Sequence, residues 1–87
     1  MSYTIKLRPA AVKALRGIDR VNQRRIQGAI TLLASNPRPP SCKPLVGRPG
    51  WRVRVGNYRI IYTINDSELL IVVITIGHRR DVYAGLR

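Results

Sequence analysis

A predicted β-hairpin over residues 51–62 constrains the fold of this 87-residue chain more than any other feature. Apolar and basic side chains alternate up to Gly56-Asn57, a dipeptide suited to a two-residue type II′ turn, and a second alternating segment follows it. A turn of this length places Arg54 directly opposite Arg59, and opposed residues share one face of a sheet. The hairpin therefore has an apolar face that must pack against the rest of the protein and a basic face that points away from it.

The basic face is expected to hold three arginines, Arg52, Arg54 and Arg59. Like charges directly opposite each other destabilise a strand pair. A solvated surface is one explanation, but positions that break a folding rule tend to be functional sites. The sequence therefore favours a phosphate-binding site on this face. Trp51 alternates with valines, so it is expected to cover the core rather than to stack on RNA.

The first half of the chain has helical signals. Residues 3–7 alternate as in a half-buried strand. Pro9 suits the first turn of a helix that ends before Gly17, and Asp19 suits the N-cap of a second helix. Asn36-Pro37 is expected to stop that second helix.

The second half of the chain has the signals of a sheet. Residues 37–50 hold five of the six prolines and are expected to form a loop with no regular element of its own. The apolar run 69–76 predicts an interior strand covered on both faces. The order β-α-α-β-β-β predicts the α+β class: a four-stranded antiparallel sheet with two N-terminal helices packed on one face. Residues 1–87 are expected to form one domain.

Net charge indicates a polyanionic partner. The chain has 16 basic and 4 acidic residues, a formal charge of +12. Thirteen of the basic residues are arginines, whose planar guanidinium suits bidentate phosphate contacts. No apolar run is long enough to cross a bilayer, so no membrane partner is expected. The lone Cys42 and an N-terminus without a signal-peptide pattern predict a cytoplasmic protein. The net charge and the arginine content favour nucleic acid as its partner.

Acidic residues are too few for a metal site. The four acids are Asp19, Asp66, Glu68 and Asp81, and one His with one Cys cannot build a zinc site. We therefore expect no metal and no cofactor. RNA does not need one, because its own 2′-hydroxyl can attack the adjacent phosphate while arginines neutralise the developing charge.

Three segments resemble the RelE branch of the RelE/ParE toxin superfamily: Lys43-Pro44-Leu45 with Gly47, residues 51–62, and Gly77-His78-Arg79-Arg80-Asp81-Val82-Tyr83. The resemblance covers the whole chain. It implies an antiparallel sheet with two helices, cleavage of messenger RNA in the ribosomal A site, inhibition of translation, and neutralisation by a co-expressed antitoxin.

Residue roles follow from the resemblance by position. Arg52 and Arg54 stand at a pair of basic strand residues, which are commonly lysines in the RelE branch. Arg59 and Arg79 stand at two arginines that stabilise the scissile phosphate. Tyr83 stands at a tyrosine that stacks on or orients the cleaved nucleotide.

The arginines at the first pair leave the general base open. Arginine stays protonated at any useful pH and makes a poor base, so Tyr83 and His78 are the candidates. Further basic residues are expected to contact RNA or ribosomal RNA: Lys43, Arg48, Arg80 and Arg87.

The expected partners are a cognate acidic antitoxin, the ribosome and messenger RNA. The toxin is expected to be monomeric alone and hetero-oligomeric with its antitoxin. Two alternatives remain open from the sequence. One is a ParE-like toxin that poisons DNA gyrase and is not a nuclease, and the other is a non-catalytic RNA- or ribosome-binding module.

Overall fold

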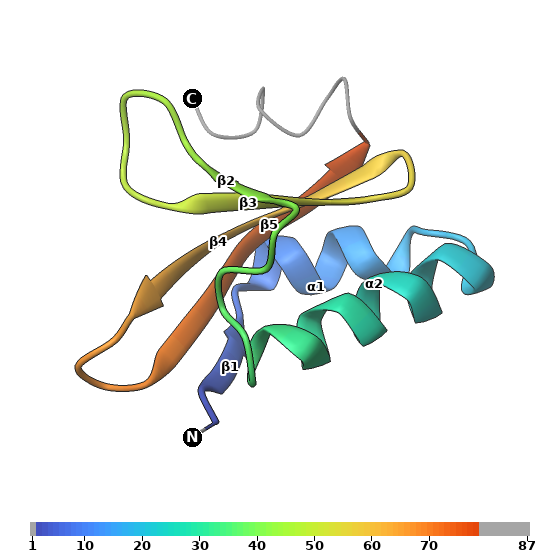
Figure 1. Cartoon of the computed structure of the whole chain (residues 1–87). Helices are drawn as coiled ribbons and strands as arrows, with labels where there is room; N and C mark the ends of the chain where they lie inside the picture. Colours follow the sequence, from blue (N-terminus) through green and yellow to red (C-terminus); the bar gives the residue numbers. More distant parts are fainter. Residues whose placement is uncertain (1, 79–87) are drawn as a thin grey trace.

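The computed structural model describes residues 2–78, which form two helices packed on one face of a five-stranded sheet (Figure 1). In chain order the elements are β1 (Thr4–Leu7), α1 (Pro9–Arg16), α2 (Arg20–Leu33), β2 (Cys42–Pro44), β3 (Trp51–Val55), β4 (Tyr58–Asn65) and β5 (Leu70–His78). The strand order across the sheet is β1-β5-β4-β3-β2. Helix α1 lies against β5 and β1, and α2 lies against β3. The α+β class predicted from the sequence is confirmed.

Both helices begin where the sequence predicts, and α1 ends there too, whereas α2 ends at Leu33, before the predicted stop at Asn36-Pro37. Pro9 occupies the first turn of α1, and Gly17 follows the last residue of that helix. The Asp19 carboxylate caps α2 by accepting a hydrogen bond of 3.2 Å from the backbone N–H of Asn22. This bond and a second one from the Asn22 side-chain amide hold the pKa of Asp19 below its usual value.

The hairpin has the predicted register. Arg54 pairs with Arg59, and Arg52 pairs with Ile61. Gly56 has a φ of 59° whereas Asn57 keeps a negative φ, which is the pattern of a type II′ turn. Strand β5 lies between β1 and β4, so the interior position predicted for the apolar run is also confirmed.

Two details of the predicted sheet are wrong. The sheet has five strands rather than four, because Cys42–Pro44, expected in an irregular loop, pairs antiparallel with β3 as β2. The sheet is also mixed rather than antiparallel, because β1 runs parallel to β5. Alternation reveals a half-buried strand but not the direction of its neighbour, and three residues are too few to show a period. Pro44 is tolerated because β2 is an edge strand.

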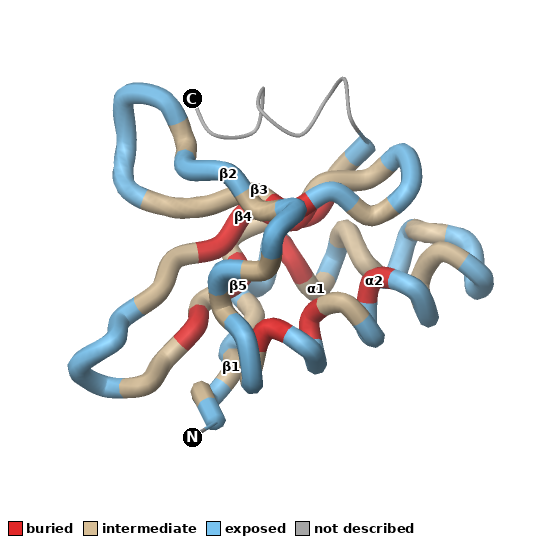
Figure 2. The backbone as a smooth tube through the Cα atoms, viewed as in Figure 1, coloured by how far each residue is buried: buried red, intermediate tan, exposed pale blue. Residues whose placement is uncertain are grey.

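The core lies between the helices and the sheet (Figure 2). Its buried members are Ala11, Ile26, Ile30, Leu33, Val53, Ile60, Tyr62, Ile71, Val73 and Ile76. The partly buried Trp51 packs against this cluster, which confirms its expected role, and Tyr58 packs there as well. Since Val53 and Ile60 face the helices, the residues that alternate with them face the other way.

Candidate functional site

A small cavity of about 110 Å³ opens among basic side chains of three neighbouring strands. Its lining residues are Ser41, Lys43, Arg52, Arg54 and Arg59, and we call this group the arginine cradle. Lys43 comes from β2, two arginines come from β3, and one comes from β4. The cradle therefore brings together three predicted catalytic residues on the face that the helices do not cover.

Strand pairing explains why these side chains meet. Arg54 is paired with Arg59, and Lys43 is paired with Arg52, so the two opposed pairs place four cations side by side. Such a concentration of donors suits a phosphate group. The sequence predicts Lys43 only as a general RNA contact and has no signal for Ser41, because both positions depend on β2, a strand without a periodic pattern.

The arginines of the cradle differ in exposure. Arg54 is exposed, and its Nε donates a hydrogen bond of 3.3 Å to the carbonyl oxygen of Gly56. Arg52 and Arg59 are half-buried, so they have less conformational freedom to lose when an anion binds.

A second basic surface adjoins the hairpin turn. Three arginines are exposed on α2: Arg20, Arg24 and Arg25. A Cβ atom added to Gly56 would lie 3.2 Å from the Arg25 guanidinium, so the Arg25 side chain reaches the turn that connects β3 and β4. One basic side chain of the helical layer, that of Arg25, thus reaches the turn next to the cradle.

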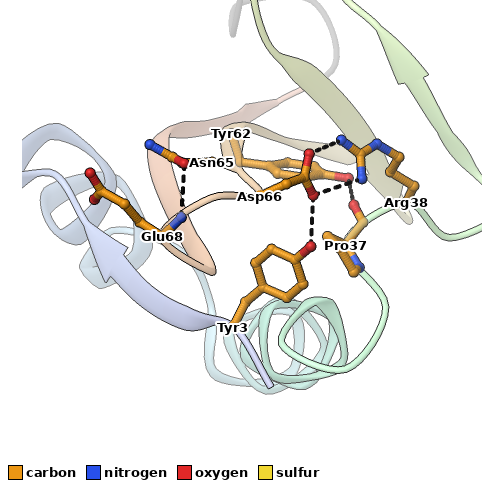
Figure 3. Close-up of polar contacts among 7 residues, drawn as sticks. All are labelled: Tyr3, Pro37, Arg38, Tyr62, Asn65, Asp66 and Glu68. Carbon is orange, nitrogen blue, oxygen red and sulfur yellow. Dashed lines mark hydrogen bonds and ion pairs between the residues drawn. The ribbon is translucent and has the colours of Figure 1, made fainter. Parts of the chain in front are cut away.

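A cluster of polar contacts holds the segment that leads into β2 (Figure 3). The Arg38 guanidinium donates two hydrogen bonds to the Asp66 carboxylate, at 2.8 and 3.2 Å, and the Tyr3 hydroxyl donates a third at 2.7 Å. We call these three residues the polar clasp. Arg38 also lies 5.3 Å from the centre of the Trp51 ring. Beside it, the Tyr62 hydroxyl donates to the Pro37 carbonyl oxygen at 2.7 Å.

The clasp has clear electrostatic effects. The hydrogen bonds from Arg38 and Tyr3 lower the pKa of Asp66 to about 2. The hydrogen bond to Asp66 raises the pKa of Arg38 and that of Tyr3. Burial raises the pKa of Tyr62. All four side chains therefore keep their protonation states through the neutral range. The clasp holds Arg38, and the Tyr62 hydroxyl holds Pro37.

The structure does not bring His78 to the arginine cradle. His78 pairs with Tyr58, whose side chain packs on the helix-facing core, and the two rings meet edge to face at 5.8 Å. Both residues line a wide depression of about 520 Å³ beside α1. Gly77, which pairs with Arg59, takes the position on the cradle side. Strand β5 continues two residues beyond the predicted run, and the alternation puts His78 on the opposite face.

The other predicted contacts lie elsewhere. Arg48 is exposed in the segment between β2 and β3 and does not line the cradle. Arg79, Arg80, Tyr83 and Arg87 lie outside the described residues. Within residues 2–78 no three His, Cys, Asp or Glu side chains gather where they could hold a metal ion. Neither α1 nor α2 is long and apolar enough to cross a membrane.

Comparison with known proteins identifies the family. Residues 5–83 match the family model of the ParE toxin of the parDE type II toxin–antitoxin system. The chain belongs to this toxin family. The toxin is also 29% identical, over 87 residues, to a RelE-like toxin protein of Escherichia coli, with 95% of this chain and 92% of the relative aligned. The predicted membership of the RelE/ParE superfamily is confirmed.

Solved structures support the same relationship. The toxin resembles RelE in the archaeal RelE–RelB complex of Pyrococcus horikoshii, with a TM-score of 0.81, 28% identity, and coverage of 91% of this chain and 97% of that one. The RelBE2 toxin–antitoxin complex of Mycobacterium tuberculosis matches with a TM-score of 0.82 at 24% identity, over 93% and 95% of the two chains. A mutant of E. coli RelE in the free state matches with a TM-score of 0.79 at 21% identity, over 97% and 93%. The last two similarities concern the fold alone.

Proposed function

We propose that this toxin is an endoribonuclease that cuts messenger RNA on the ribosome and thereby inhibits translation. The observation that carries the proposal is the arginine cradle, where three strands place four cations around one small cavity. A phosphate of RNA fits the charge and the donor geometry of this site. The likeness to RelE toxins in sequence and fold supports the same activity.

The chemistry that suits the cradle is attack by the RNA itself. The 2′-hydroxyl oxygen bonds to the adjacent phosphorus while the bond from phosphorus to the 5′-oxygen breaks, leaving a 2′,3′-cyclic phosphate and a 5′-hydroxyl. Arg52, Arg54 and Arg59 stabilise the negative charge that develops on the phosphate. The ribosome and the cradle together hold the RNA in line for the attack. Arg79 and Tyr83, at the C-terminal end of the chain, are proposed to complete the site.

An antitoxin is the proposed inhibitor. Solved relatives of this fold include RelE bound to RelB, and a chain of net charge +12 favours an acidic partner. An acidic segment that covers the arginine cradle would block RNA and reduce the repulsion among the cations. Growth arrest on expression, and rescue by an acidic partner encoded beside the toxin, are the expected phenotypes.

A gyrase-directed activity is the second candidate, because the matching family model is that of ParE toxins. Two assays separate the candidates. Purified toxin should cut messages on programmed ribosomes, and a single 2′-deoxy substitution on the 5′ side of the scissile phosphate should abolish cleavage. Supercoiling by DNA gyrase should be unaffected. Inhibited gyrase with uncut messages would instead establish the ParE-like function, and equal cutting of the deoxy message would exclude attack by the 2′-hydroxyl.

A further inference from the structure

The lining of the arginine cradle divides into groups that can transfer a proton and groups that cannot. Arg52, Arg54 and Arg59 carry guanidiniums, which hold their protons throughout the useful pH range. Ser41 offers a hydroxyl, which is a hydrogen-bond donor but a very weak acid. Lys43 carries an ammonium, and an ammonium releases its proton far more readily than a guanidinium does. Among the described lining residues, Lys43 is thus the best proton donor.

The position of Lys43 suits this role. It lies on the edge strand β2, opposite Arg52, and lines the same cavity as Arg59 of β4. Its exposed side chain is long and flexible, so the ammonium can reach an atom held by the arginines that line the same cavity. Other titratable groups of residues 2–78 are placed elsewhere: His78 faces the helices, and Asp66 is bound by Arg38 and Tyr3.

We propose that Lys43 is the general acid of the cleavage reaction, an inference that rests on the proposed nuclease function. As the 2′-oxygen bonds to phosphorus and the bond to the 5′-oxygen breaks, the Lys43 ammonium gives its proton to the departing 5′-oxygen. The product strand then begins with a 5′-hydroxyl, and the neutral amine regains a proton from water. The proton of the attacking 2′-hydroxyl passes to water, directly or through Tyr83. Protons balance over the cycle.

A substrate with a better leaving group tests this assignment. In a message whose scissile 5′-oxygen is replaced by sulfur, the leaving thiolate needs no proton, because thiols are far stronger acids than alcohols. Lys43→Ala and Lys43→Arg should each slow single-turnover cleavage of the oxygen message on saturating ribosomes by roughly 10²-fold or more. Both variants should cut the sulfur message within a few-fold of the parent rate.

Two controls accompany these variants. Lys6→Ala removes the same charge from an exposed position on β1, on the far edge of the sheet, and should leave both rates unchanged. Arg59→Ala should be slow on both messages, because it removes charge stabilisation and not a proton. Thermal unfolding of each variant checks that the fold is retained.

The possible outcomes separate this inference from the proposed function. Full activity of Lys43→Arg on the oxygen message would show that positive charge suffices, and the general-acid role would be lost. Equal slowing of Lys43→Ala on both messages would make Lys43 a phosphate-binding residue only. A parent toxin that cuts neither message would overturn the nuclease function itself, and with it this role for Lys43.

Discussion

Arg54 and Arg59 lie directly opposite each other across the β3–β4 hairpin, on the face of the sheet that the helices leave uncovered. Opposed residues of an antiparallel pair have their Cβ atoms about 4.5–5.5 Å apart, so two guanidinium-bearing chains start from neighbouring positions and repel each other. Hydrophobic packing on the other face of the same strands offsets this cost. The hairpin thus combines a stable apolar face with a basic face suited to binding an anion.

Relief of this repulsion should make the protein more stable and less active. Arg54→Thr keeps a strand-forming side chain and removes one of the opposed charges, so the free energy of unfolding should rise by roughly 0.2–1 kcal/mol. The gain should shrink in 1 M salt, where the charges are screened. Urea unfolding and the cleavage rate measure the two effects.

Lys6→Thr is the matched control for this gain. It also replaces an exposed cationic side chain of a strand by threonine, but this position is paired with Val72 rather than with a cation. Its stability should change little with salt. If Arg54→Thr is less stable than the parent at low salt, the opposed arginines are not a cost to the fold.

Loss of Arg59 should separate chemistry from binding. Removal of one donor to the transition state typically costs on the order of 10²–10³ in rate, so Arg59→Ala should abolish toxicity while ribosome binding survives. A triple replacement of Arg20, Arg24 and Arg25 by alanine should instead weaken ribosome binding and reduce its salt dependence by about one unit for each phosphate that is no longer neutralised. Its single-turnover rate should be near that of the parent. If Arg59→Ala instead weakened ribosome binding and left the single-turnover rate unchanged, the cradle would be a binding surface without a role in chemistry.

The polar clasp should make stability depend on pH in the acid range. The pKa of Asp66 is about 2 in the folded protein, below the value of about 3.9 for an unfolded aspartate. Its contribution to stability is therefore present above the unfolded pKa and is lost as the pH falls through about 4 toward 2. Urea unfolding of the parent and of Asp66→Asn over this range should converge at the acid end. Glu68→Gln should leave the slope due to Asp66 intact, and parallel curves for parent and Asp66→Asn would show that the ion pair adds no stability.

The clasp should also hold β2, the strand that carries Lys43, in its place at the edge of the sheet. Cys42 is a half-buried thiol between Ser41 and Lys43, so its alkylation rate reports on the attachment of β2. Asp66→Asn frees Arg38 and should raise the alkylation rate several-fold and slow RNA cleavage. Glu68→Gln makes the same change of charge in the same turn, where Glu68 contributes its backbone N–H to the side chain of Asn65, and should alter neither rate. Unchanged alkylation in Asp66→Asn would mean that the clasp does not hold β2.

Local signals in the sequence were sufficient for the hairpin and the helices. Turn length and period-two alternation fix the pairing of Arg54 with Arg59, and capping residues fix the helix ends. The clasp could not be predicted, because it joins residues 28 and 63 positions apart in the chain. Strand β2 gave no periodic signal, so the place of Lys43 in the cradle became evident only from its pairing with Arg52. The face of His78 could not be predicted by strict alternation, because the buried residues Ile71, Val73 and Ile76 change phase at an irregularity in the pairing of β4 with β5.

The short edge strand β2 has a consequence for how such a toxin can evolve. The proposed neutralisation of the phosphate charge depends on arginines of the inner strands β3 and β4. A change of register in these strands would move core residues into solvent. The proposed proton donor depends on three residues at the margin of the sheet, which follow a proline-rich connection that tolerates substitution. If the proposed reaction holds, mutations in that connection should therefore change its speed while the hairpin that carries the three arginines is inherited unchanged.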